Sequence, residues 1–160
     1  GDFSEKLKGR VEVGYQTRQF DRFSNGLGGG SHGLPIFSAE VDYGFTEKRK
    51  ASLTYRHSGN VSIESPDSAI TQDFIIVQVS QQIGTTGKLS ASFGATYELD
   101  TYETRDAREY QYLRMNAGVT YSFNQWIKSS LRYDFEIFDS SNGNIDYNVN
   151  RVMLGLSVGY

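Results

Sequence analysis

Charged side chains recur at every second position in several segments of this chain, and ion pairing is the chemistry that this spacing offers. Arg132, Asp134 and Glu136 form one such run. Residues two apart share one face of an extended strand, and guanidinium groups bind carboxylates in a bidentate manner. We therefore predict an interior polar network with the members Arg10, Glu12, Glu40, Asp42, Arg56, Glu98, Arg114, Arg132, Asp134, Glu136 and Arg151.

Residue types that serve catalysis or metal binding are scarce. The chain has no cysteine, and its 2 histidines, His32 and His57, fit no Ser-His-Asp spacing. The Asn- and Asp-rich run at residues 139–146 lacks the spacing of an EF-hand, and no Lys-Ser/Thr pair follows the glycines at 28–30 as in a phosphate loop. We expect no enzyme, no cofactor and no metal, and we interpret both histidines as solvated loop or interface side chains.

Composition bounds the class of protein. The 160 residues are enough for one domain, 1–160, and the net charge of -3 gives no footprint for nucleic acid. No run of about 18 apolar residues is available for a membrane-spanning helix. A β-barrel is the other structure that satisfies its backbone in lipid, so a membrane location would require one.

Alternation with a period of two marks the strands. Along Leu131–Ile137, for example, Leu, Tyr, Phe and Ile alternate with Arg, Asp and Glu. Eight segments follow this pattern: Leu7–Arg18, Pro35–Phe45, Ala51–Arg56, Asp73–Ile83, Leu89–Asp100, Tyr110–Phe123, Trp126–Phe138 and Tyr147–Tyr160. The pattern predicts an all-β, eight-stranded antiparallel up-and-down transmembrane β-barrel.

The connections alternate between long and short. Long polar stretches lie at residues 21–34, 58–72 and 101–108, whereas residues 46–49, 84–87 and 124–125 form short turns; Asn142-Gly143 is typical of a hairpin tip. Membrane barrels have short periplasmic turns and long outer loops. We therefore expect both termini to be periplasmic and the protein to lie in the bacterial outer membrane.

Two orientations of the barrel fit the alternation. In a membrane barrel the apolar row faces lipid, whereas in a soluble ligand-binding barrel it faces inward. The narrow interior of eight strands favours the smaller, polar row inside. Aromatic residues at the short-turn ends, Phe45, Phe123, Trp126 and Tyr160, are typical of a lipid interface.

The last strand resembles the terminal strand of bacterial outer-membrane barrels, with Leu154, Leu156 and Val158 at alternate positions before the final Tyr160. This resemblance implies an assembly signal that the barrel-assembly machinery reads. The stretch Asn148–Leu156 is also similar to the putative β-barrel porins of type two, which are usually longer. By strand number the chain resembles the small eight-stranded group that includes OmpA and OmpX.

These observations predict an integral barrel whose polar side chains plug its interior and which anchors extracellular loops in the bilayer; the loops would bind an unknown ligand, if any. A porin-like passive channel is the first alternative, with the chain as the C-terminal part of a larger barrel. A soluble ligand-binding barrel is the second alternative.

Overall fold

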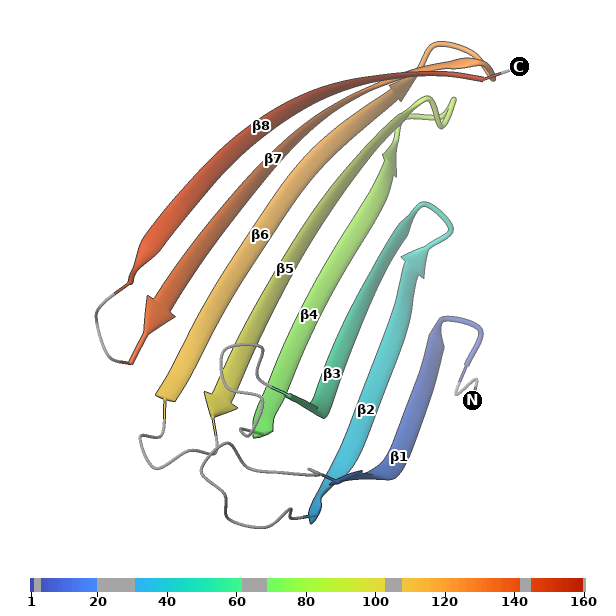
Figure 1. The fold of residues 1–160 in the computed structure, drawn as a ribbon. Coiled ribbons are helices and arrows are strands. Elements are labelled where there is room, and N and C mark those ends of the chain that lie inside the picture. The colour runs from blue at the N-terminus through green and yellow to red at the C-terminus, as the bar shows by residue number, and fades with distance from the viewer. Residues whose placement is uncertain (2–3, 20–30, 62–68, 103–107, 142–144, 160) are drawn as a thin grey trace.

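A single antiparallel β-sheet makes up the computed structural model of the chain (Figure 1), which describes residues 1, 4–19, 31–61, 69–102, 108–141 and 145–159. Among these residues no helix is long and apolar enough to cross a membrane. The strands are β1 (Leu7–Gln19), β2 (Ser31–Thr46), β3 (Arg49–Val61), β4 (Ala69–Ile83), β5 (Leu89–Tyr102), β6 (Arg108–Ser122), β7 (Ile127–Ser140) and β8 (Tyr147–Val158). The predicted all-β, eight-stranded, up-and-down fold is confirmed.

Each strand pairs with its neighbour in the sequence, and the sheet curves as it passes from β1 to β8 (Figure 1). Seven antiparallel ladders join the strands in order. Among the described residues no ladder joins β8 to β1, so this part of the chain forms an open sheet and not a closed cylinder. The alternation of residues fixes the faces of a strand, but it does not specify which strands close a barrel.

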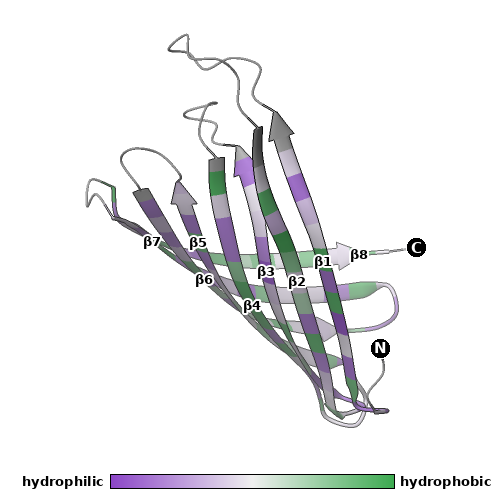
Figure 2. Ribbon diagram, turned by 90° about the horizontal axis from the view of Figure 1, so that it is seen from below, coloured by the Kyte–Doolittle hydropathy of each residue, from purple (hydrophilic) through white to green (hydrophobic). Residues whose placement is uncertain are grey.

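The register keeps the two rows of side chains apart across the whole sheet, and the hydropathy colours alternate along the strands (Figure 2). Residues that lie directly opposite each other in a ladder share a face. Val11 lies opposite Ala39, which lies opposite Tyr55; Arg10 lies opposite Glu40, which lies opposite Thr54. We call the face with Val11 the apolar face and the face with Arg10 the polar face.

The short turns follow from their residue types. Gly84 and Gly87 have φ values of 78° and 65°, which glycine adopts without steric cost. At the β6–β7 turn the Asn124 side chain accepts hydrogen bonds from the backbone N–H groups of Trp126 and Ile127, at 2.8 and 2.9 Å. The third short connection joins β2 to β3 between Thr46 and Arg49. Because the strands run up and down in order, the three short turns lie at one end of the sheet, which we call the turn end; the opposite end is the loop end.

Several strands extend further toward the loop end than their residue types predict. Residues 31–34 were expected in a loop, but they pair with residues 16–19 of β1. Likewise residues 58–61 pair with residues 69–72. Backbone pairing between neighbouring strands outweighs the low strand preference of Gly, Ser and Asn at these positions. The predicted Asn142-Gly143 tip lies outside the described residues.

Candidate functional site

All the side chains of the predicted polar network lie on one face of the sheet, because their positions follow the register from Arg10 on β1 to Arg151 on β8. The structure brings some of them together. Arg10 pairs with Glu12 on the same strand, and the Arg132 Nε donates to the Asp134 Oδ1 at 2.6 Å, also within one strand. These ion pairs run along the polar face and do not cross a lumen.

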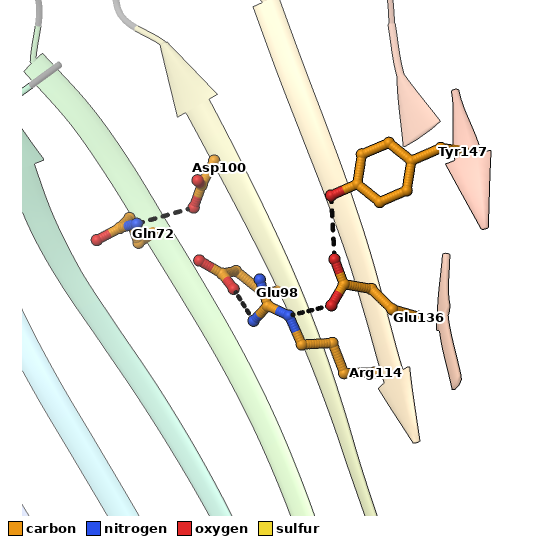
Figure 3. Close-up of polar contacts among 6 residues, drawn as sticks. All are labelled: Gln72, Glu98, Asp100, Arg114, Glu136 and Tyr147. Atoms are coloured by element: carbon orange, nitrogen blue, oxygen red, sulfur yellow. Dashed lines mark hydrogen bonds and ion pairs between the residues drawn. The ribbon is translucent and has the colours of Figure 1, made fainter. Parts of the chain in front are cut away.

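Arg114 on β6 is the centre of the most extensive ionic group (Figure 3). Its Nη1 donates to the Glu98 Oε2 on β5 at 2.6 Å, and its Nε lies 3.5 Å from the Glu136 Oε2 on β7. The Tyr147 hydroxyl on β8 donates to the other Glu136 oxygen at 3.0 Å. One guanidinium group thus ties three strands together, and the tyrosine adds a fourth.

The same end of the polar face holds a second carboxylate that the structure buries. Asp100 accepts a hydrogen bond at 3.1 Å from the Gln72 side-chain amide on β4. Asp100 and Glu98 are each only 8% exposed. Buried carboxylates need hydrogen-bond or ionic partners, and here Gln72 and Arg114 supply them. The loop end of β4–β8 is therefore the most closely packed part of the polar face.

Aromatic rings cover this ionic group on its loop side. Phe138 stacks on Tyr147 with ring centroids 5.0 Å apart, and it contacts Tyr110 and Tyr112 at 5.5 and 4.7 Å. The Arg114 guanidinium lies 4.8 Å from the centre of the Tyr112 ring, which is cation–π geometry. We call these rings and the ionic group, namely Gln72, Glu98, Asp100, Tyr110, Tyr112, Arg114, Glu136, Phe138 and Tyr147, the aromatic–ionic cluster.

The sequence alone did not identify the cluster, although one signal was available. Tyr110, Tyr112 and Phe138 occupy positions of the polar row, where small or charged residues prevail. The predicted network contains only charged members of that row, and neither Asp100, which the alternation places in the row, nor Gln72 is among them. Which of these side chains are neighbours depends on the register between strands, and the register is not visible in any single strand.

Toward the turn end the polar face is hollow. A cavity of about 710 Å³ is lined chiefly by polar-face residues, among them Lys50, Ser52, Gln78, Ser80, Ser92 and Asn116. Gly94 lies in its wall, and a Cβ atom there would come within 2.8 Å of the Asn116 amide nitrogen. Small residues and short polar side chains therefore leave open space along this half of the face.

The apolar face presents its large side chains outward from the sheet. Leu131, Phe93 and Val119 are 53%, 45% and 43% exposed, and the edge residue Leu154 is 83% exposed. A soluble barrel would bury this row, whereas a bilayer covers it. The exposed aliphatic and aromatic surface is therefore the surface that hydrocarbon would contact.

The apolar surface slants across the strands, and the slant has the size that a tilted membrane barrel requires. Val11 is the middle of the apolar stretch of β1. Passing from each residue to the one directly opposite it on the next strand leads from Val11 to Asn148 on β8. The apolar stretch of β8 is centred between Leu154 and Leu156, about seven residues further toward the turn end, which is about one residue per ladder. A step of about 3.3 Å along the strand for each 4.8 Å across it corresponds to a tilt of about 35°. Strands of membrane barrels tilt by about 35–45°.

Aromatic pairs mark the turn end of the apolar face. Tyr43 packs edge-on against Phe45 with centroids 4.7 Å apart, and Tyr121 packs in the same way against Phe123 at 4.9 Å. Trp126 lies in the turn that follows and is 48% exposed. Three of the four predicted interface aromatics thus lie at the turn end. The fourth, Tyr160, which is also the last residue of the predicted assembly signal, lies outside the described residues. Leu154, Leu156 and Val158 all lie exposed on β8.

Polar residues mark the loop-end margin of the apolar face. The Tyr55 hydroxyl donates to the Asp73 Oδ1 at 2.6 Å, and the His57 Nδ1 lies 2.8 Å from the same oxygen. His57 therefore has a specific carboxylate partner, which its position in the sequence did not reveal. Among the described residues no group of three or more His, Cys, Asp or Glu side chains is arranged to hold a metal.

Comparison with known proteins agrees with this geometry. The family described as Putative beta-barrel porin 2 matches residues 2–160, nearly the whole chain. No curated protein and no solved structure matches it. The family, the eight antiparallel strands and the slanted apolar surface together identify a porin-like outer-membrane β-barrel protein, and the chain belongs to the Putative beta-barrel porin 2 family.

Proposed function

We propose that the polar face lines a water-filled passage and that the protein is a passive channel for small hydrophilic solutes. The observation that supports this most directly is the cavity of about 710 Å³ between Lys50, Gln78, Ser92 and Asn116. Its short polar side chains bind water readily and leave room for a solute. The porin family to which the chain belongs favours the same function.

The exposure of the ion pairs also favours a wet passage. The side chains of Arg10 and Arg132 are 71% and 57% exposed, although each is paired with a carboxylate. A plug of side chains would have to remove such groups from water, at a cost of several kcal/mol per ion in order of magnitude. Pairs that run along the face leave the two arginine side chains hydrated and avoid that cost for them.

Planar-bilayer recording of the refolded protein tests the proposal. We expect stepwise conductance, and we expect Ser92→Trp to lower the unit conductance because the indole fills the cavity. Ala91→Trp is the matched control, since Ala91 is the neighbouring residue on the apolar face and should leave the conductance unchanged. A folded protein that gives no conductance would contradict a channel.

A second function, an anchor that presents outer loops on a plugged barrel, is favoured by the aromatic–ionic cluster. Glu98, Asp100 and Phe138 are buried at the loop end, where a plug would have to lie. Heat-modifiable migration on a gel, which reports a folded barrel, together with an absence of conductance would support this function over the channel.

We further propose that the turn end faces the periplasm, because short turns lie on that side of membrane barrels. β1 begins and β8 ends at this end of the sheet (Figure 1). The exposed apolar residues of β8, Leu154 and Leu156 among them, support the proposal that the assembly machinery reads this strand.

A further inference from the structure

Basic and acidic side chains of the polar face are unevenly distributed between its two ends. We divide the face at the middle of the apolar stretch that each strand presents on its opposite side. The turn-end half is rich in lysine, and the loop-end half is rich in carboxylates. Lys50, Lys88 and Lys128 of the turn-end half are not members of the ion pairs described above.

In the turn-end half basic side chains outnumber carboxylates. Lys50 lies opposite Ser80 on β4, and Lys128 lies opposite Ser122 on β6 and Ser157 on β8. The Lys88 carbonyl accepts from the Ser122 N–H, which continues the β5–β6 ladder and places Lys88 at the same level as Lys128. These three lysines are exposed. Their register neighbours on the polar face are serines and a glycine. The carboxylate of Asp42, also at this end, lies opposite Lys8, so the turn-end half carries a net positive charge.

In the loop-end half carboxylates outnumber basic side chains. Glu98 and Glu136 share the single guanidinium group of Arg114, and the neighbouring Asp100 carboxylate is held by the uncharged Gln72 side chain. Asp134, one step closer to the middle, adds a further carboxylate. The cluster therefore carries a net negative charge in a poorly hydrated setting, where the field of a charge extends further than in bulk water.

We infer that the passage rectifies ion current because its fixed charge changes sign along its length. The inference rests on the proposed channel function. When the voltage drives cations in from the loop end and anions in from the turn end, both enter a region that attracts them, and mobile ions accumulate. The opposite voltage drives both ions out of these regions and depletes the passage, so the current is smaller.

Salt sets the size of this effect. The Debye length is about 10 Å at 0.1 M and about 3 Å at 1 M ionic strength. At the lower concentration the fixed charges act across a passage lined by these side chains, whereas at the higher concentration they are screened. Rectification should therefore be strong in dilute salt and weak in concentrated salt.

The test uses the full chain in planar bilayers with equal KCl on both sides. In 0.1 M KCl we expect the currents at opposite voltages to differ by at least about twofold, and in 1 M KCl we expect them to become nearly equal. Because the chain has no cysteine, Lys128→Cys provides a single thiol. A charged, membrane-impermeant thiol reagent should change the current of this variant only when it is added to the chamber that the turn end faces. The side from which it acts therefore shows the orientation of the protein, and with it the voltage polarity at which the larger current is expected.

A triple variant, K50Q/K88Q/K128Q, should remove most of the rectification and shift the reversal potential in a KCl gradient toward cation selectivity. Arg49→Gln is the control, because Arg49 lies on the apolar face, where its Nε donates to Gln81 at 3.1 Å. A folded protein without conductance would refute the channel itself. Conductance with equal currents at both polarities in 0.1 M KCl, or rectification that survives the triple variant, would overturn the inference while leaving the channel in place.

Discussion

At the scale of single residues, Arg114 shows that arginine–carboxylate pairs that look alike in the sequence can contribute differently to stability in the structure. Arg114 contacts a carboxylate that is nearly buried, whereas Arg10 contacts Glu12, whose side chain is 58% exposed. Exposed pairs contribute little to stability because water and salt screen them. A buried carboxylate that loses its partner keeps the full cost of desolvation.

Replacing Arg114 therefore has a larger expected cost than replacing Arg10. We expect Arg114→Met to lower the free energy of unfolding by about 2–3 kcal/mol, discounted because the arginine itself is partly exposed. Arg10→Met should lower it by at most about 1 kcal/mol. Urea unfolding in phospholipid vesicles, followed by the fluorescence of Trp126, measures both.

The double variant with Glu98→Gln provides the internal check. Once the buried charge is gone, the loss of Arg114 should cost less, so the two changes together should cost less than the sum of the single effects. Strictly additive effects, or equal losses for Arg10 and Arg114, would contradict the importance of the buried Glu98–Arg114 pair.

The residue scale also shows what sequence reasoning missed at the site. The alternation assigned the charged residues to one row, and the register bears out that shared face. It did not identify Asp100 as a partner of Gln72, or Phe138 as a neighbour of Tyr110, because these contacts join different strands. A strand reveals its faces through its own residues, but its neighbours become known only from the pairing.

At the scale of elements, strand identity was predictable and strand length was not. All eight strands lie where the alternation predicts them, since burial of one face depends on a local period of two. The ends differ because pairing is cooperative between strands. Ser31–Leu34 have no strong strand preference, yet the facing residues of β1 extend the ladder to Gln19.

The assignment of the two faces can be tested on one strand with adjacent residues. Val119 lies on the apolar face of β6, near the middle of its apolar stretch, and Thr120 lies on the polar face. In a bilayer, Val119→Arg should destabilise the protein by about 2–4 kcal/mol, because a charge would enter hydrocarbon. Thr120→Arg should cost at most about 1 kcal/mol, since that face is hydrated.

Refolding into vesicles, followed by urea unfolding, compares the two variants. Equal tolerance at both positions would argue against hydrocarbon on the apolar face. A larger loss at Thr120 would indicate that the faces are reversed.

At the scale of the whole molecule, the slant of the apolar surface connects the sheet to the membrane. A bilayer is flat, so strands whose apolar stretches shift by about one residue per ladder must tilt to bring these stretches to one level. The aromatic residues Phe45, Phe123 and Trp126 then lie together at the turn-end margin. Aromatic side chains favour the level of the lipid headgroups.

The single tryptophan reports this placement directly. In vesicles of brominated phospholipids, we expect bromine near the headgroups to quench Trp126 more strongly than bromine deep in the acyl chains. The control variant W126F/L131W moves the fluorophore five residues along the chain, into the outward-facing stretch of β7, where the order of quenching should reverse. Deep quenching of Trp126 in the unaltered protein would contradict its position at the interface.

The outer edges of the sheet restrict how any barrel that contains it can close. The Gly159 N–H donates to the Trp126 carbonyl on the β7 side, so the even-numbered residues of β8, such as Leu154, direct their backbone groups away from the sheet. On β1 the Gly9 N–H donates to Gly1, away from β2, so the odd-numbered residues, such as Val11, do the same. Both margins thus offer donors and acceptors from residues of the same face. In successive antiparallel ladders the hydrogen-bonded pairs come alternately from residues of the polar face and of the apolar face. Since both margins offer residues of the apolar face, β8 can pair with β1 directly or through an even number of intervening strands. An odd number of intervening strands would not match this alternation.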